Sequence, residues 1–373
     1  MSEVVRNLLS RGDLSFRDFV EVALYHPESG YYAQQTSPVG REGDYITSPL
    51  LSPAFSFALA RLVREFVSRA GDALCTIVDI GCGDGSLIHS LCGAAGDGRT
   101  RFVGVDRALE RVPAEVRSRV EFVRTIDEIP RGGRHLIFSN ELFDALPFAR
   151  LVQREEGLHE LWVTERDGHL DWSERDAPAE YRDYFASRGV ALQKGQFADI
   201  SLEWGAMCRD ICRVVDEGLI VTFDYGYPQS KLFHPRARRF GTAAAYAKHR
   251  VSRDLLVDPG EQDLTAHLNF DDLIRAGEEL DFTTLFFDRQ AVFLLALGIT
   301  AHGLFTPVTD LAVENLSAGV DLLDRRDAAH QLVLPAGIGH DIRVLVQGRG
   351  IGSGWSFQQT FKDQTKLEDA HQK

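Results

Sequence analysis

Hydrophobic and polar residues alternate in a repeating strand–helix pattern between residues 74 and 150. Short apolar runs, typical of buried strands, occupy 75–80, 102–105, 121–123 and 136–139, and a helical spacing of apolar residues covers 86–92. Repeated strand–helix units form a parallel sheet with helices on both faces. We therefore expect an α/β fold of the Rossmann-like type.

The pattern before this region predicts two helices. Apolar residues recur at helical spacing over 14–25, Ser15 is a suitable N-cap, and His26-Pro27 ends the segment. A loop rich in Gly, Ser and Thr follows, and helical spacing resumes over 53–70. We expect these segments to form a helical cap ahead of the sheet.

The pattern after residue 148 changes to alternating strands around Asp167-Gly168, which predicts a β-hairpin. A polar stretch to about residue 215 is predicted to be helical, and 229–270 is basic at its start with little regular spacing. The other candidate elements lie at 219–223, 282–286, 291–297 and 342–347.

The turn after the first strand is rich in glycine. Residues 79–85 read Asp-Ile-Gly-Cys-Gly-Asp-Gly, and Asp106 ends the next strand. A dinucleotide site would have its third glycine at Ser86. The carboxylates of Asp79 and Asp84 would repel a pyrophosphate, but they suit the sulfonium and ammonium of S-adenosylmethionine.

We therefore predict an S-adenosylmethionine site in this loop, with Asp106 accepting hydrogen bonds from the ribose hydroxyls. The predicted cofactor-binding residues of the two strand ends are Asp79, Gly81, Cys82, Gly83, Gly85 and Asp106. The alternative is that the glycines only mark a tight strand-to-helix turn.

Polar residues also follow the strand at 136–139, where the chain reads Asn-Glu-Leu-Phe-Asp-Ala-Leu-Pro over 140–147. Ligands of doubly wound sheets bind outside the carboxyl ends of the strands, which places these side chains at the same crevice. Asn140 could position a ligand and bind the cofactor, and Glu141 or Asp144 could neutralise a cationic nucleophile or take its proton. The alternative is a polar helix start whose side chains cap backbone amides.

Several motifs, in this order along the chain, resemble the MidA/NDUFAF7 family of class I S-adenosylmethionine-dependent methyltransferases over about residues 13–300. They are Tyr31-Tyr32, the segment 43–49, the glycine loop, 140–147, 223–227, Asp258-Pro259-Gly260 and 263–270. The family often has Glu-Leu-Gly-Pro-Gly-Arg-Gly at the loop, whereas the sequence here matches the general class I loop.

The resemblance implies a class I methyltransferase sheet with an N-terminal helical cap and an inserted substrate-side subdomain. It implies methylation of protein arginine linked to assembly of respiratory complex I, so a respiratory complex subunit is the expected kind of protein substrate. The alternatives are a small-molecule methyltransferase, with specificity set by 149–215 and 229–270, and a non-catalytic assembly factor. An NAD-dependent dehydrogenase is disfavoured by Ser86 and the acidic loop.

The segment 43–49 suggests a lid in which Thr47 or Ser48 hydrogen-bonds the cofactor. The alternative is a capped turn before the helix that Ser52 and Pro53 begin.

His267 is either a base or a structural histidine. Tyr225 and Tyr227 either line the substrate channel or pack.

We divide the chain into five parts on these grounds. They are a cap with its lid loop (1–70), the cofactor-binding core (71–148), an inserted hairpin and helical subdomain (149–215), the remainder of the sheet (216–357) with a substrate-side insertion at 229–270, and a polar tail (358–373).

The amino-acid composition limits the kinds of molecule that the protein is expected to bind. The 373 residues are 44% hydrophobic and 26% charged, as in soluble globular proteins, and the net charge of −14 disfavours nucleic acid and anionic membranes. Five scattered cysteines show no metal-ligand spacing, so we expect no metal. The N-terminus lacks a signal core and the longest apolar run, 291–297, is too short to span a bilayer, so we expect a cytoplasmic protein without membrane insertion. The oligomeric state is left open, with a homodimer as one alternative.

Overall fold

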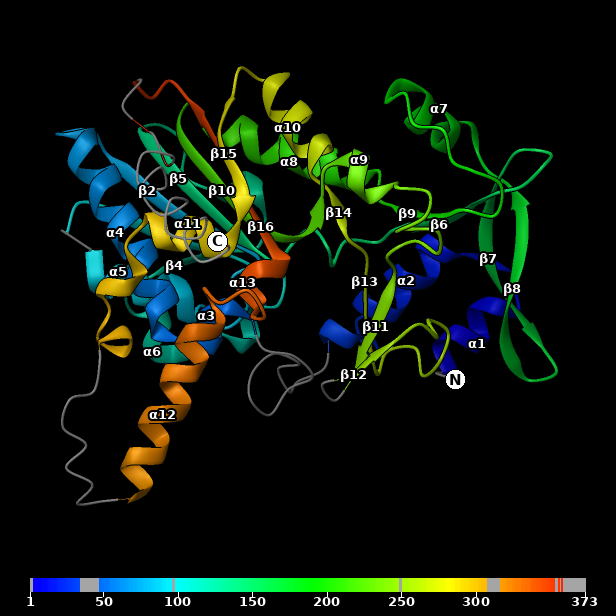
Figure 1. The fold of residues 1–373 in the computed structure, drawn as a ribbon, viewed down its shortest axis with the longest axis horizontal. Helices are drawn as coiled ribbons and strands as arrows, with labels where there is room; N and C mark the ends of the chain where they lie inside the picture. Colours follow the sequence, from blue (N-terminus) through cyan, green and yellow to red (C-terminus); the bar gives the residue numbers. More distant parts are fainter. Residues whose placement is uncertain are drawn as a thin grey trace, which may run out of the picture. The chain divides into compact units, whose positions relative to one another are not determined.

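The computed structural model describes residues 3–33, 47–95, 98–247, 250–306, 316–352, 355 and 357 (Figure 1). The chain forms two compact units, each assembled from three separate stretches. Unit 1 comprises Met1–Ile46, Leu142–Met207 and Tyr225–Leu273, and unit 2 comprises Thr47–Glu141, Cys208–Asp224 and Ile274–Lys373. Three elements cross the boundary: α8 (Glu203–Val214), β10 (Glu217–Tyr227) and α10 (Phe270–Glu278).

Unit 2 is built on a mixed sheet with the strand order β15-β16-β10-β5-β2-β3-β4. Its strands besides β10 are β2 (Cys75–Ile80), β3 (Arg101–Val105), β4 (Glu121–Val123), β5 (Arg134–Asn140), β15 (Thr283–Arg289) and β16 (Ile342–Arg349). Neighbours from β4 to β10 pair in parallel, whereas β15 and β16 pair antiparallel. These strands confirm the α/β fold and the runs predicted at 75–80, 102–105, 121–123 and 136–139.

The central strands of this sheet are buried along their length, as expected for parallel strands covered by helices. Every residue of β2 is buried, and α4 (Pro53–Ala70) and α5 (Ser86–Ala95) pack against it and against each other (Figure 1). Helix α4 begins as predicted, with the hydroxyl of Ser52 accepting a hydrogen bond from the amide of Ala54.

The remaining helices of unit 2 are short, apart from α12. They are α3 (Ser48–Leu51), α6 (Ala114–Arg117), α11 (Gln290–Ala296), α12 (Leu316–Gln331) and α13 (Ile338–Asp341), with 3₁₀ turns at Leu109–Arg111, Ile126–Glu128, Ile299–Ala301 and Gly303–Phe305. The candidate element at 291–297 is thus a helix, α11.

Unit 1 contains two antiparallel sheets. The first has the strand order β1-β7-β6-β9, and β8 also pairs with β7 in it. The second has the strand order β12-β11-β13. The strands are β1 (Leu14–Ser15), β6 (Ala149–Gln153), β7 (Leu158–Arg166), β8 (His169–Asp176), β9 (Phe197–Ile200), β11 (Ala244–Ala247), β12 (Arg250–Ser252) and β13 (Asp263–Thr265); β14 (Leu268–Asn269) pairs with β10. Strands β7 and β8 form the predicted hairpin, and both Asp167 and Gly168 have positive φ at its turn.

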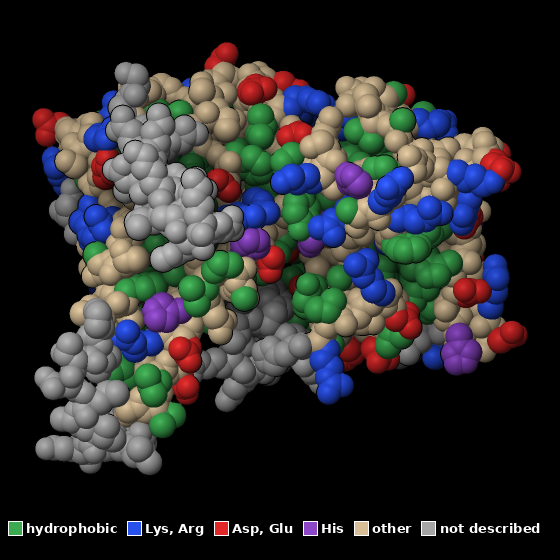
Figure 2. Space-filling view, in the orientation of Figure 1, with side chains coloured by type: hydrophobic (Ala, Val, Ile, Leu, Met, Phe, Trp, Pro, Cys, Tyr) green, Lys and Arg blue, Asp and Glu red, His purple; other side chains and the backbone are tan. Residues whose placement is uncertain are grey.

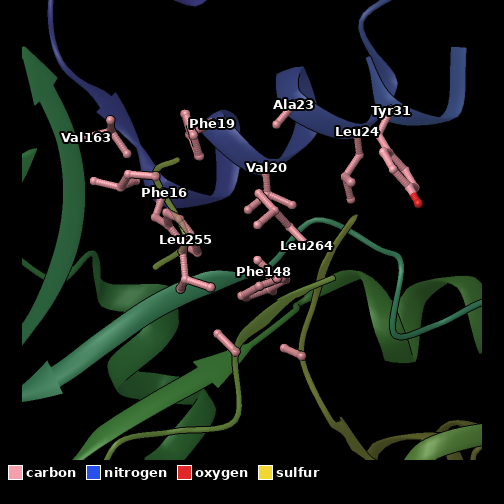
Figure 3. Packing of buried hydrophobic residues seen from close by; sticks show 14 of the residues in the cluster. Phe16, Phe19, Val20, Ala23, Leu24, Tyr31, Phe148, Val163, Leu255 and Leu264 are labelled. Atoms are coloured by element: carbon pink, nitrogen blue, oxygen red, sulfur yellow. The ribbon is translucent and has the colours of Figure 1, made fainter. Parts of the chain in front are cut away.

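The core of unit 1 forms around α2 (Phe16–Tyr25), which confirms the helix predicted over 14–25 except at Leu14–Ser15, which form strand β1. Ser15 is its N-cap and accepts a hydrogen bond from the amide of Asp18. Figure 3 shows side chains of α2, among them Phe16 and Val20, directed toward Phe148 and Leu264. The other helices of unit 1 are α1 (Glu3–Leu9), α7 (Ala179–Ser187) and α9 (Gln229–Leu232), with a 3₁₀ turn at Tyr31–Ala33.

The structure corrects the helix prediction for the stretch up to residue 215, and several other predictions remain untested. The polar stretch to residue 215 is helical in α7 and α8 but not at 197–200, where β9 pairs with β6. This strand depends on a distant partner, so local spacing does not reveal it. Residues 43–46 of the lid and the tail 358–373 lie outside the described residues, and the five-part division remains a prediction. No helix in the described ranges is long and apolar enough to cross a membrane.

Candidate functional site

The carboxyl ends of three neighbouring strands bring the predicted cofactor residues of unit 2 together. Ile80 at the end of β2 pairs with Val105 on one side and with Ser139 on the other. Because β3 and β5 flank β2, the chain reverses its direction of winding here, which is where open α/β sheets bind ligands. The amides of Gly81 and Cys82 donate to the carbonyl of Val105 at 2.8 and 3.2 Å, which holds the glycine loop over the strand ends.

The three glycines of the loop have different roles, although all have positive φ, at 75°, 56° and 75° for Gly81, Gly83 and Gly85. A Cβ on Gly85 would lie 2.8 Å from Cζ of Phe122, so this glycine is needed for packing. A Cβ on Gly83 would meet nothing within 4 Å and would project into open space. A side chain at position 83 would therefore occupy this open space.

Asp106 ties the loop to the end of β3. Its Oδ2 accepts from the amide of Gly83 at 2.9 Å, and its Oδ1 accepts from the amide of Ala108 at 2.8 Å. Each carboxylate oxygen keeps a further acceptor site, so Asp106 can still accept hydrogen bonds from ribose hydroxyls. Its orientation is thus set before any ligand binds.

Acidic side chains are concentrated under the loop. Asp79 is 3% exposed, and burial, together with the nearby carboxylates of Asp106 and Asp84, raises its pKa to about 8. A positively charged ligand would lower this electrostatic cost, which fits a sulfonium and an ammonium group. Burial also raises the pKa of the Cys82 thiol, so it is a poor nucleophile.

Asn140 is the last residue of β5, and Glu141 follows it in a strained conformation. Glu141 has φ 51°, uncommon for a residue with a long side chain, and its amide donates to the carbonyl of Phe223 at 2.8 Å. Nδ2 of Asn140 donates to Oε1 of Glu141 at 3.0 Å. Oδ1 of Asn140 is buried and has no hydrogen-bond partner within the described part of the chain, so it is available to a ligand donor such as an ammonium.

Thr47 and Ser48 begin α3, also in unit 2. Thr47 occupies the N-cap position without a side-chain cap hydrogen bond. Ser48 is buried, and its hydroxyl lies 2.9 Å from Nε2 of Gln290. Their predicted contact with the cofactor stays a prediction, and the hydroxyl of Ser48 already has a structural partner.

Asp144 belongs to unit 1, where it forms part of a second polar group. Its carboxylate is buried and accepts from the hydroxyl of Thr265 at 3.2 Å. Burial raises the pKa of Asp144 to about 6, although the hydrogen bond from Thr265 acts in the opposite direction. This carboxyl is therefore half-ionised near pH 6 and mostly ionised at neutral pH, where it could accept a proton.

The segment 263–270 makes further contacts besides that of Thr265 with Asp144. Asp263 accepts from the hydroxyl of Tyr32 at 3.0 Å, and the ring of His267 lies 5.4 Å from that of Tyr227. The sequence pattern identifies this segment as a motif but indicates no chemistry for Thr265. The only indication in the sequence is the motif that the segment shares with the family. The hydrogen bond itself cannot be predicted from local sequence, because Asp144, the partner of Thr265, lies 121 residues away in the chain.

The glycine loop also requires Gly104, a residue that the sequence pattern does not indicate. A Cβ on Gly104 of β3 would lie 2.4 Å from Cε1 of Phe122 and 2.9 Å from Sγ of Cys82. Gly104 therefore lets the ring of Phe122 pack beneath the loop.

Comparisons with known proteins agree with this geometry. Residues 58–287 match a family model described as "putative S-adenosyl-L-methionine-dependent methyltransferase". The chain is 24% identical over 322 residues to the protein arginine methyltransferase NDUFAF7, mitochondrial, of Danio rerio, covering 75% of this chain and 72% of the relative. It is 22% identical over 342 residues to the protein of that name from Homo sapiens, covering 80% and 73%. A crystal structure of a Burkholderia thailandensis protein bound to S-adenosyl-homocysteine superposes with a TM-score of 0.81 at 27% identity, covering 95% of this chain and 92% of that one.

Proposed function

Since the chain belongs to the family of S-adenosyl-L-methionine-dependent methyltransferases, we propose that it methylates an arginine side chain of a protein. The family and the similar structure with bound S-adenosyl-homocysteine establish the cofactor and the reaction class. The arginine acceptor is supported by the names of the relatives from Danio rerio and Homo sapiens. The observation in the structure that carries it is the oriented carboxylate of Glu141 at the end of β5.

The glycine loop and the strand ends would hold the cofactor. Gly83 leaves space for it, Asp106 would bind the ribose hydroxyls, and Asp79 would balance its positive charge in the ionised form that a nearby cation favours. Oδ1 of Asn140 would accept from its ammonium. When bound, S-adenosylmethionine supplies an electrophilic methyl carbon on a positively charged sulfur.

Glu141 would orient the acceptor. The hydrogen bond from Asn140 fixes one of its oxygens, and the carboxylate can accept charge-assisted hydrogen bonds from a guanidinium. In the transfer, the acceptor nitrogen forms a bond to the methyl carbon, the sulfur–carbon bond breaks, and its electron pair stays on sulfur. The nitrogen then loses a proton, which Glu141 can accept or pass to water. The protein thus contributes alignment and charge to a direct displacement.

Asp144 would be the second acid acting on the substrate. Its raised pKa suits a group that takes up a proton near neutral pH, and Thr265 holds its carboxylate in place. We infer that the substrate is a subunit of a respiratory complex, methylated in the cytoplasm. The basis is the resemblance to the arginine methyltransferase relatives and the sequence features given above.

The experiment uses purified protein, methyl-labelled S-adenosylmethionine and a cell lysate. We expect label in the protein fraction, recovered as methylarginine after hydrolysis. Glu141→Gln should lower the rate of labelling about a hundredfold, because a neutral amide neither holds the guanidinium by charge nor takes its proton. The matched control is Glu121→Gln, which removes an exposed carboxylate at the start of β4.

The outcomes separate the alternatives. Label confined to small molecules would indicate a small-molecule methyltransferase. Absence of label in a protein that still binds S-adenosylmethionine by calorimetry would indicate a non-catalytic assembly factor. An equal loss in both variants would remove Glu141 from the proposed mechanism.

A further inference from the structure

A strongly basic segment of unit 1 has no role in the proposed function. Residues 229–241 contain no acidic residue in a chain whose net charge is −14. Their basic residues are Lys231, Arg236, Arg238 and Arg239. We refer to residues 231–240 as the basic turn. Figure 2 shows Lys and Arg side chains gathered on one face over α9 and β9, the elements beside this turn in Figure 1.

The charges of the basic turn are not neutralised within the described ranges. Lys231, Arg236 and Arg239 are exposed, and none of these side chains forms an ion pair with an Asp or Glu in that part of the chain. Other arginines of unit 1 do, such as Arg150 with Asp199 and Arg188 with Asp272. The exposed positive charge is therefore available to another molecule.

The basic turn is held rigidly, in spite of its exposure. Asp199, whose side chain is fully buried, accepts from the amides of Thr242 and Ala243 at 2.6 and 2.8 Å. Arg150 pairs with the same carboxylate at 2.6 Å and donates to the carbonyl of Phe240 at 3.1 Å. At the other end, Nε2 of Gln196 donates to the carbonyl of Phe233 at 2.9 Å. A buried ion pair and two anchored ends thus fix the backbone that carries the charges.

The same support presents an aromatic side chain to solvent. Phe240 is 65% exposed, while its carbonyl is held by Arg150. Its neighbour Arg239 accepts a hydrogen bond at its carbonyl from the amide of Phe197 at 2.8 Å. Arginine and aromatic residues are enriched at the centres of protein interfaces and among the residues that contribute most to binding. A rigid support also reduces the conformational entropy lost on binding.

We propose that the basic turn is a docking site for an acidic segment of a protein partner, with glutamate or aspartate side chains binding Lys231, Arg236 and Arg239 and an apolar residue covering Phe240. The composition favours a protein over other polyanions, since three of the four cations are arginines around an exposed phenylalanine. The proposal does not depend on the identity of the methyl acceptor.

Fluorescence anisotropy with a labelled peptide of alternating glutamate and leucine tests the site. We expect the full chain to bind this peptide, and to bind it more weakly as salt increases. Replacing Lys231→Gln, Arg236→Gln and Arg239→Gln together should weaken the affinity about tenfold, because three exposed charge pairs are lost. Phe240→Ser should weaken it about fivefold. Arg238 is left in place because its guanidinium lies 4.6 Å from the ring centre of Tyr227.

The matched control removes three exposed charges elsewhere in unit 1, by Arg6→Gln, Arg11→Gln and Arg253→Gln, and should change the affinity less than about twofold. An equal loss in both triple variants, or no binding of the peptide by the unmodified chain, would overturn the proposal. The proposal would also be overturned if the triple variant of the basic turn lost binding to single-stranded DNA or phosphatidylserine vesicles but still bound the peptide. Unchanged affinity for S-adenosylmethionine and an unchanged circular dichroism spectrum would show that the turn variant is folded, which separates this test from that of the methyltransferase mechanism.

Discussion

Some residues of the glycine loop are required by the packing of the protein, and others leave space for a ligand. Gly83 has positive φ and open space where a side chain would project, whereas Gly85 and Gly104 are limited by the ring of Phe122. Asp79 lies beneath them as a carboxyl that burial keeps protonated up to about pH 8. The loop is therefore shaped for a ligand of defined charge, and both properties can be tested by substitution.

Gly83→Val is expected to abolish binding of S-adenosylmethionine, because its branched side chain would fill the space above the loop. Isothermal titration calorimetry should show an affinity at least about a hundredfold lower. Gly71→Val is the matched control: Gly71 also has positive φ and nothing within 4 Å, but it ends α4. Unchanged affinity in a folded Gly83→Val protein would contradict the assignment of this space to the cofactor.

Asp79→Asn is expected to remove a pH dependence of stability in the cofactor-free protein. The pKa of Asp79 rises from 3.8 to about 8 on folding, so the folded state binds the proton more tightly than the unfolded state. The free energy of unfolding that this group contributes is complete below pH 4 and is lost as the pH rises to about 8. Urea denaturation should show the unmodified chain losing stability relative to Asp79→Asn by at most about 1.4 kcal/mol per pH unit. Parallel pH profiles of the two proteins would exclude the raised pKa.

Among the elements, β9 connects distant parts of unit 1. It pairs with β6, and Asp199 within it accepts hydrogen bonds from the amides that follow the basic turn. A Cβ on Gly241 would lie 2.2 Å from Oδ2 of this carboxylate, so glycine is needed for the close approach. One short strand thus positions a surface that we propose binds a partner.

Asp199→Ala is expected to lower the free energy of unfolding by about 3–5 kcal/mol, because it leaves Arg150 partly buried without its partner and two amides without an acceptor. Chemical denaturation measures this loss. Asp210→Ala, which breaks an exposed pair with Arg213, should cost less than about 0.5 kcal/mol. Similar costs for the two variants would show that the buried pair does not stabilise β9.

At the scale of the whole molecule, the chain forms two compact units and passes repeatedly between them. The core cluster of unit 1 combines residues from all three of its stretches, such as Phe16, Phe148 and Leu264. In unit 2, the sheet places three loops that follow its strands at one edge. Compact units of this kind can lose structure locally.

Phe16→Ala is expected to increase hydrogen exchange mainly in β6, β7 and β13 of unit 1, because it leaves a cavity in that core. Leu136→Ala, in the fully buried part of β5, should instead increase exchange in β2, β3 and β5 of unit 2. Mass spectrometry of deuterium uptake measures both patterns. An equal increase in all these strands for either variant would show that the two units open together.

Local pattern was sufficient where an element depends on nearby residues. The bounds of α4 and β2 agree with the predicted 53–70 and 75–80, since a Ser-Pro start and a continuous buried run are local signals. The fold class and the cofactor could be predicted for the same reason, because the glycine spacing and the acids around it lie within one strand–turn–helix unit.

The sequence alone thus establishes the sheet, the glycine loop, the type of cofactor and the candidate acids Glu141 and Asp144. The partners that give these residues their properties depend on the folded chain. The raised pKa of Asp79 follows from burial beside Asp106, and the hydrogen bond of Asp144 follows from contact with Thr265. Strand β9 and the support of the basic turn likewise require pairing between distant segments. Burial and long-range pairing are collective properties of a packed chain, so hydrophobic spacing within a short segment does not contain them.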